Sequence, residues 1–142
     1  MSALALRTLA KTLRPSEVSS LRTFHWSARR NKHFLNANEA TFEEAITNKD
    51  NVVLVDFYAD WCGPCKMLSP ILEKLTTDPS IKSGSGLPLD LVTVDTDTET
   101  ALALKYKIRS LPTVIAFKDG QPISQFMGAV PEAHVRNFLT AL

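Results

Sequence analysis

Residues 52–75 of this chain are VVLVDFYADWCGPCKMLSPILEKL, in which an apolar run is followed by a pair of cysteines and then by an amphipathic segment. The apolar run over 52–58 is broken only by Asp56 and predicts a central β-strand that is covered on both faces. From Cys65 onward the apolar residues recur at helical spacing and predict an amphipathic helix. Cys62 and Cys65 therefore lie between a strand and a helix, and a Cys-x-x-Cys pair in that context predicts a redox-active dithiol.

The remaining segments complete an alternating α/β pattern. The expected elements are a helix over 38–46, a strand over 89–94, a helix over 98–106 with Thr98 as its cap, hairpin strands over 113–118 and 121–127, and a last helix that opens at Pro131. The serines and glycines of residues 83–86 predict a flexible surface loop. This order of elements predicts an α/β fold in one domain over residues 31–142, with a central mixed β-sheet flanked by helices on both faces.

Composition limits the classes of protein to which the chain can belong. Its 142 residues are enough for one domain with a core, and its hydrophobic content of 44% and charged content of 22% are ordinary for globular proteins. No apolar run is long enough to span a bilayer, so we expect no membrane insertion. Two cysteines allow at most one intramolecular disulfide, which excludes a fold stapled by several disulfides.

Residues 1–30 differ from the rest of the chain in charge. They contain six basic residues and one acidic residue, whereas the other ten basic and fourteen acidic residues give the remainder a net charge of −4. The basic surplus therefore does not indicate nucleic-acid binding by the domain. An amphipathic, Arg-rich, acid-poor amino terminus without an apolar h-region is typical of a mitochondrial transit peptide. We expect cleavage between Phe24 and Lys32 and a mature protein in the mitochondrial matrix. The alternatives are chloroplast import, a disordered basic tail or a surface-binding helix.

The two cysteines are expected to have different roles. A thiolate attacks a disulfide, so the attacking cysteine needs a lowered pKa and access to solvent. Cys62 lies just ahead of the predicted helix, where free N–H groups and the helix dipole favour a negative sulfur, and we expect it to be the nucleophile. Cys65 lies one turn further on and is expected to resolve the mixed disulfide. Gly63 and Pro64 set the turn between them, and Pro64 stiffens it.

Asp56 is a carboxylate inside an apolar strand and is therefore expected to be buried. Burial without a compensating partner raises the pKa of a carboxyl group. We interpret Asp56 as a proton acceptor for Cys65, because buried acids beside reactive groups fit the pattern of tuned catalytic residues. The alternative is a core aspartate whose oxygens are satisfied by backbone donors or by water.

A Cys-x-x-Cys pair can also be half of a zinc site. A closed structural site needs four ligands, and the imidazoles on offer are His25, His33 and His134. Two of these three lie in or beside the leader, so we expect no metal site.

Further residues match one known pattern in both type and spacing. They are residues 55–66 (VDFYADWCGPCK), Pro70, Pro112-Thr113, residues 117–120 (FKDG) and Gly128. With these residues, the span from about Phe34 to Leu142 closely resembles the thioredoxin family.

The resemblance implies a site built around the cysteines. Pro112 would form a cis peptide and lie against the cysteines, leaving the Leu111 backbone free to pair with an extended substrate. The implied apolar docking surface consists of Trp61, Gly63, Pro64, Leu111, Pro112, Met127 and Gly128. The alternative for Met127 is a strand residue packed in the core, and the alternative for Gly128 is a turn residue that ends the strand. One departure is Leu91, at a position where many bacterial relatives carry a lysine near the buried acid.

The resemblance also implies a function. The expected protein is a monomeric dithiol reductase of protein disulfides that needs no bound cofactor and is recycled by an NADPH-dependent thioredoxin reductase. Peroxiredoxins are possible clients by the same implication. Two alternatives are a structural subunit that uses the fold as a clamp on another enzyme, and a metal-binding module.

Overall fold

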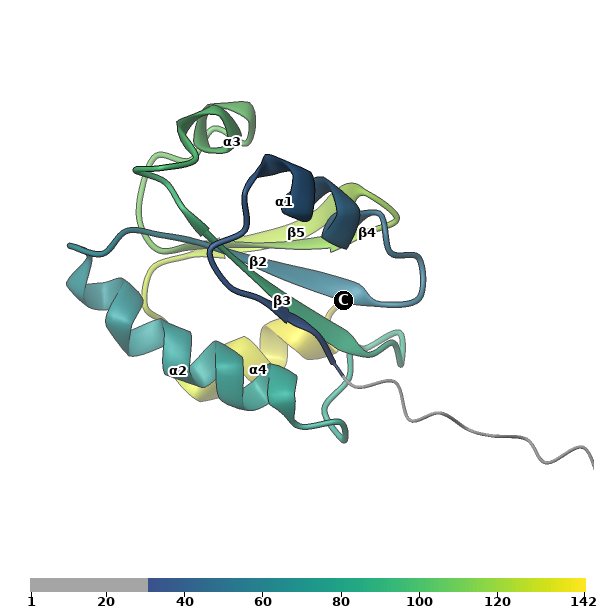
Figure 1. Ribbon diagram of the computed structural model, residues 1–142. Coiled ribbons are helices and arrows are strands. Elements are labelled where there is room, and N and C mark those ends of the chain that lie inside the picture. Colours follow the sequence, from purple (N-terminus) through teal and green to yellow (C-terminus); the bar gives the residue numbers. More distant parts are fainter. Residues whose placement is uncertain (1–30) are drawn as a thin grey trace, which may run out of the picture.

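The computed structural model describes residues 31–142, and the expected transit peptide over 1–30 lies outside the described residues. Helices and strands alternate along the described chain, except that two strands follow one another before the last helix (Figure 1). The elements are β1 (His33–Phe34), α1 (Glu39–Ile46), β2 (Val52–Tyr58), α2 (Gly63–Thr77), β3 (Leu89–Asp95), α3 (Thr100–Lys105), β4 (Thr113–Lys118), β5 (Gln121–Met127) and α4 (Glu132–Thr140). None of the helices in this part of the chain is both long and apolar enough to cross a membrane.

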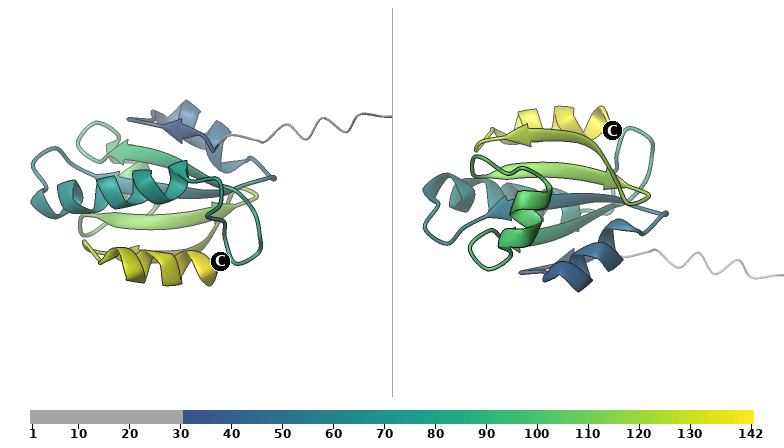
Figure 2. Two further views of the ribbon diagram at one scale, coloured as in Figure 1. Left: turned by 90° about the horizontal axis from the view of Figure 1, so that it is seen from below. Right: turned by 90° about the horizontal axis from the view of Figure 1, so that it is seen from above.

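The strands form a mixed sheet in the order β1-β3-β2-β4-β5. β1 and β2 run parallel to β3, whereas β4 runs antiparallel to both β2 and β5. Helices α1 and α3 cover one face of the sheet, and α2 and α4 cover the other, as the views from above and below make clear (Figure 2). The predicted architecture, a central mixed sheet with helices on both faces, is confirmed.

Strand β2 is apolar on both faces because it separates two cores. Val53, Val55 and Phe57 belong to the core beneath α1, while Val52 and Leu54 belong to the core beneath α2. Burial of each such side chain contributes about 1.5–3 kcal/mol. Alternation along the strand then places residue 56 on the α2 face, under the helix that follows the cysteines.

Two features of the fold differ from the sequence-based expectation. The two-residue strand β1 was not predicted, because it is too short to carry a periodic pattern and is defined by its pairing with Leu91 and Val92 of β3. Helix α3 begins at Thr100 rather than at residue 98, and Glu99 occupies the cap position. The Thr98 hydroxyl instead donates to the Asp95 carbonyl, so the expectation that Thr98 caps the helix was wrong.

The Ser83–Gly86 segment is packed against the carboxyl end of the chain. Ser83 is 5% exposed, the Gly84 N–H donates to the Leu139 carbonyl at 2.9 Å, and the Ser85 N–H donates to the Leu142 carbonyl at 2.8 Å. Gly84, Ser85 and Gly86 are exposed, so the segment lies at the surface as expected, and these backbone hydrogen bonds tie it to the end of the chain. Composition indicated a turn, but the backbone contacts with the end of α4 are tertiary and leave no local signal.

Gly84 is the position in this loop that a side chain would disturb most. A Cβ atom there would lie 2.0 Å from the Thr140 carbonyl oxygen, which is part of the backbone. We expect Gly84→Ala to lower the free energy of unfolding by about 2–4 kcal/mol, because the loop and the end of α4 must separate. Urea denaturation of the oxidised protein measures this loss.

Gly86→Ala is the matched control for this prediction. Gly86 has a φ of +79° but open space around its Cα, so alanine there adds only backbone strain of about 1 kcal/mol. Equal losses in the two variants would show that the close approach at Gly84 is not what requires glycine.

Candidate redox site

Cys62 and Cys65 lie at the amino terminus of α2 and are joined by a disulfide, with their Cα atoms 5.3 Å apart. Cys62 is the N-cap of the helix, and its sulfur accepts a hydrogen bond from the Cys65 N–H at 3.2 Å. Pro64 lies in the first turn of the helix. N–H groups in the first turn have no acceptor within the helix, so the N–H that proline lacks costs no intrahelical hydrogen bond. Cys62 is 4% exposed and Cys65 is 1% exposed, so both cysteines are buried and Cys62 is slightly the more exposed.

Asp56 lies fully buried on β2, beneath the helix that carries the cysteines. Its Oδ2 accepts a hydrogen bond from the Ser69 hydroxyl at 3.3 Å, and its Oδ1 has no hydrogen-bond partner. Burial raises the pKa of Asp56 from an ordinary 3.8 to about 7, while the Ser69 hydrogen bond lowers it and the charge of Glu73 raises it by smaller amounts. At neutral pH the carboxyl group is therefore present in both protonation states, as an efficient proton acceptor requires.

Leu91 occupies the position at which a lysine would supply a counter-charge for Asp56. Its side chain is 1% exposed and belongs to the apolar core beneath α2. This position therefore supplies no cation to hold Asp56 in its charged form, which agrees with the dominance of burial in raising the pKa of Asp56.

The peptide bond between Leu111 and Pro112 is cis, and β4 begins at the next residue. Leu111 packs against the small cluster formed by Ala59, Cys62 and Cys65. The chain before β4 is thus brought to the cysteines, although the two segments are almost fifty residues apart in the sequence.

Two apolar side chains of the expected docking surface are open to solvent. Trp61 is 71% exposed, and its Nε1–H donates to Asp97 Oδ2 at 2.9 Å. Met127 is 59% exposed at the end of β5, so the alternative that it packs in the core was wrong. Gly128 has a φ of +89°, and its N–H donates to the Pro112 carbonyl at 2.8 Å, which ties the end of β5 to the cis proline.

Residues 33–141 match the family model described as thioredoxin. This chain belongs to the thioredoxin family. A thioredoxin from Pseudomonas aeruginosa is 35% identical over 110 residues, which are 78% of this chain and 96% of the relative. A Staphylococcus aureus thioredoxin is 38% identical over 101 residues, covering 71% of this chain and 89% of its own.

Solved structures of thioredoxins have the same fold. Thioredoxin from Fasciola hepatica superposes with a TM-score of 0.65 at 32% identity, covering 75% of this chain and 96% of its own. The oxidised form of mitochondrial thioredoxin 3 from Saccharomyces cerevisiae has a TM-score of 0.63 at 30% identity and covers 77% of this chain and 94% of its own.

Membership in the thioredoxin family establishes the chemistry of the cysteine pair. The protein is a thiol-disulfide oxidoreductase of the disulfide-reductase type, and its redox-active group is the Cys62–Cys65 disulfide. Thioredoxins bind no cofactor, because the cysteine pair itself holds the electrons.

The zinc alternative finds no support among the described residues. Within residues 31–142, His, Cys, Asp and Glu form no group of three or more that could hold a metal ion. A ring nitrogen of His33 is hydrogen-bonded to the Thr76 hydroxyl at 2.9 Å, and His25 lies outside the described residues.

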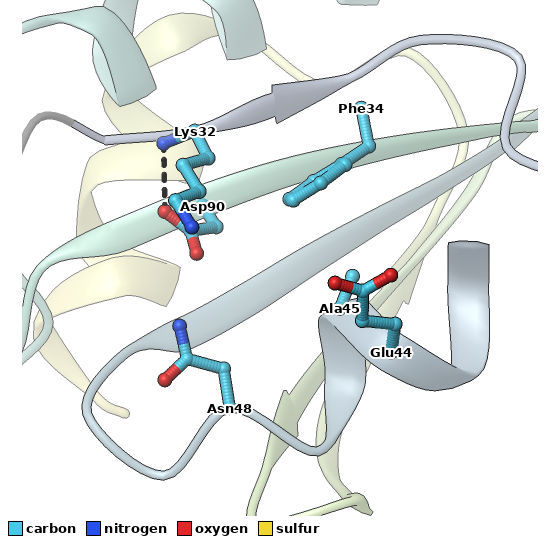
Figure 3. Close-up of a pocket in the computed structure, with 6 residues that line it drawn as sticks. All are labelled: Lys32, Phe34, Glu44, Ala45, Asn48 and Asp90. Atoms are coloured by element: carbon cyan, nitrogen blue, oxygen red, sulfur yellow. Dashed lines mark hydrogen bonds between the residues drawn. The ribbon is translucent and has the colours of Figure 1, made fainter.

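A hollow of about 290 Å³ lies at the other end of this thioredoxin's sheet (Figure 3). Asp90, at the start of β3, accepts a hydrogen bond from the Lys32 N–H at 2.8 Å through Oδ1 and from Asn51 Nδ2 at 2.7 Å through Oδ2. Because β2 and β3 are parallel and Cys62 follows the end of β2, Asp90 and the cysteines lie at opposite ends of the strands. The hydrogen bond from the Lys32 N–H to Asp90 ties the chain just before β1 to the start of β3.

Sequence reasoning missed two residues of the redox site, Ser69 and Asp97. Ser69 had a usable signal, since it follows Cys65 by four residues and therefore shares its helical face. The contact between Asp97 and Trp61 depends on how the elements pack, and the sequence carries no pattern for it.

Proposed function

We propose that this thioredoxin reduces disulfides of other proteins, with Cys62 as the nucleophile, Cys65 as the resolving thiol and Asp56 as the proton acceptor. The observation that supports the assignment most directly is the place of Cys62 at the cap of α2, with the Cys65 N–H on its sulfur. In the reduced protein the same N–H and the helix dipole stabilise a Cys62 thiolate.

The proposed reaction conserves electrons and protons at each step. The Cys62 thiolate attacks the client disulfide, forms a mixed disulfide and releases the first client thiolate. The Cys65 thiol gives its proton to Asp56, and the Cys65 thiolate then attacks Cys62 Sγ. This second step forms the Cys62–Cys65 disulfide and releases the second client thiolate, so two electrons have passed from the cysteine pair to the client.

The client would dock on the exposed apolar surface beside the cysteines. Trp61 and Met127 are exposed, the Gly128 N–H donates to the Pro112 carbonyl, and Leu111 packs on the cysteine cluster. Gly63 and Pro64 are exposed between the two cysteines. We propose that an extended client segment lies across these residues with its disulfide at Cys62.

We further propose that an NADPH-dependent thioredoxin reductase returns the disulfide to the dithiol, and that peroxiredoxins are among the clients. The support is membership in the family, which implies a reductase and client proteins. We expect the protein to act as a monomer, without nucleic-acid partners.

We propose that residues 1–30 direct import into the mitochondrial matrix. The support is the basic, acid-poor composition of this segment, together with the likeness of the domain to a yeast thioredoxin that is mitochondrial. Incubation of the full chain with isolated mitochondria should yield a shortened, protease-protected product. A variant with Arg7, Arg14 and Arg22 changed to Glu should remain full-length and protease-sensitive, and import of this variant at the original rate would contradict the proposal.

The decisive test of function is NADPH-coupled reduction of insulin by residues 31–142, with thioredoxin reductase supplied. We expect rapid turnover that vanishes when the cysteines are changed. A folded protein that the reductase can reduce, but that does not reduce insulin, would contradict the general reductase and favour a clamp subunit or a dedicated partner.

A further inference from the structure

A cleft of about 250 Å³ opens beside α2, next to the cysteines. Tyr58, Cys65, Lys66, Ser69 and Glu73 are among the residues that line it. Asp56 does not line the cleft, but its carboxyl group is hydrogen-bonded to Ser69, which does. Ser69 therefore lies between the buried carboxyl group of Asp56 and the solvent-accessible cleft.

The Ser69 hydroxyl has one hydrogen and two acceptors within reach. The Cys65 carbonyl lies at 3.0 Å from Ser69 Oγ, and Asp56 Oδ2 lies at 3.3 Å. Since a hydroxyl donates only once, the charge on Asp56 decides between these acceptors. An ionised carboxylate attracts the hydrogen, because a charge-assisted hydrogen bond is the stronger one. A protonated Asp56 donates to Ser69 Oγ instead, and the hydroxyl hydrogen turns to the Cys65 carbonyl or to water in the cleft.

No other side chain replaces Ser69 in this role. Among residues 31–142, Ser69 is the hydrogen-bond partner of Asp56, and Asp56 Oδ1 has none. The neighbouring strands place Thr93 and Val114 opposite Asp56, and α4 contributes the apolar Val135 and Leu139 to this core.

The charged and titratable groups around Asp56 line the cleft or lie at the ends of neighbouring strands. Glu73 of α2 acts on Asp56 through its charge, and the charge of Asp56 acts on Tyr58, as do the charges of Asp60 and Asp95. Lys66 lines the cleft and is exposed. Most of these groups are acidic, and a negative neighbour disfavours a negative charge on Asp56. The group that stabilises an ionised Asp56 is therefore the Ser69 hydroxyl, which donates a hydrogen bond to it.

We infer that Ser69 is a positioning residue that passes the proton of Asp56 to water in this cleft each time the cysteine pair becomes oxidised. The inference rests on the proposed role of Asp56 as the proton acceptor for Cys65. The proton moves from Asp56 Oδ2 to Ser69 Oγ while the hydroxyl hydrogen of Ser69 moves to a water molecule. Ser69 is unchanged at the end, Asp56 is again ionised, and no electrons are transferred in this step.

Three variants of the full chain test the inference. Ser69→Ala removes the hydroxyl, Ser69→Thr keeps it, and Thr77→Val removes a hydroxyl on the same helix that bonds only the Glu73 carbonyl. Two quantities are measured in each protein: the pH midpoint of the Asp56 carboxyl carbon by ¹³C NMR in the oxidised state, and the pH profile of mixed-disulfide resolution by stopped flow. Asp56→Asn is measured alongside.

In Ser69→Ala we expect both midpoints to rise by about one pH unit, because a hydrogen bond to a charged group is lost. We also expect resolution at pH 7 to slow by roughly tenfold. Ser69→Thr should restore both quantities, and Thr77→Val should leave both unchanged. An unchanged NMR midpoint in Ser69→Ala would overturn the inference.

The remaining outcomes separate this inference from the proposed function. If the NMR midpoint moves but resolution does not, while Asp56→Asn does slow resolution, then Asp56 is the acceptor and Ser69 carries no proton. If Asp56→Asn leaves resolution unchanged at every pH, then the proposed role of Asp56 has failed, and the relay through Ser69 is overturned with it.

Discussion

Replacing Cys62 by serine is expected to abolish disulfide reduction, and replacing Cys65 by serine is expected to trap clients as mixed disulfides. Serine at position 62 removes the sulfur that accepts a hydrogen bond from the Cys65 N–H at the cap of α2, and the cysteine that remains, Cys65, is 1% exposed and therefore poorly placed to attack a client. We expect turnover to fall by at least about a thousandfold, as for other enzymes that lose a covalent nucleophile. The Cys65→Ser variant keeps the attack but lacks the thiol that releases the client.

Insulin reduction coupled to NADPH oxidation measures the first effect, and non-reducing electrophoresis with intact-mass spectrometry measures the second. Ser80→Ala, at an exposed position outside the site, is the control and should retain full activity. If Cys65→Ser accumulated no adduct while Cys62→Ser did, the roles assigned to the two cysteines would be reversed.

Asp56→Asn is expected to make the protein more stable at pH 8 and to remove part of its dependence on pH. The pKa of Asp56 is raised to about 7 in the folded protein by burial, against an ordinary 3.8. Between about pH 4 and pH 7 the folded protein therefore holds a proton that the unfolded chain has lost, so the free energy of unfolding falls as pH rises. The loss amounts to at most about 4 kcal/mol and is complete above pH 7.

Asparagine at position 56 is neutral at every pH in this range and does not suffer this loss. We expect the two proteins to have similar stability near pH 4 and to diverge up to pH 8, measured by urea denaturation with the disulfide intact. Asp119→Asn makes the same chemical change at an exposed turn with a φ of 52°, which asparagine tolerates, and should leave the pH dependence unchanged. A difference between wild type and Asp56→Asn that is constant with pH would show that Asp56 does not titrate in the folded state as described.

At position 56 the sequence predicts the burial of the side chain but not its hydrogen-bond partner. That Asp56 would be buried follows from the apolar residues on either side of it, because a strand covered on both faces leaves no exposed position in its middle. The sequence does not predict that the hydrogen bond to the Asp56 carboxyl group comes from Ser69, because the distance between β2 and α2 sets whether the two side chains meet.

The pattern of residues along the chain is enough to predict the strand, the cysteine pair and the helix of residues 52–77, together with the order of the later elements and hence the mixed sheet. These follow from hydrophobic period, turn residues and helix-start signals, which act over a few neighbouring residues. Packing between distant segments sets four other features: the pairing of β1 with β3, the close approach of Gly84 to Thr140, the exposure of Met127 and the contact of Ser69 with Asp56. Each of these depends on distances between segments far apart in the chain, and such distances are set by the packing of the whole domain.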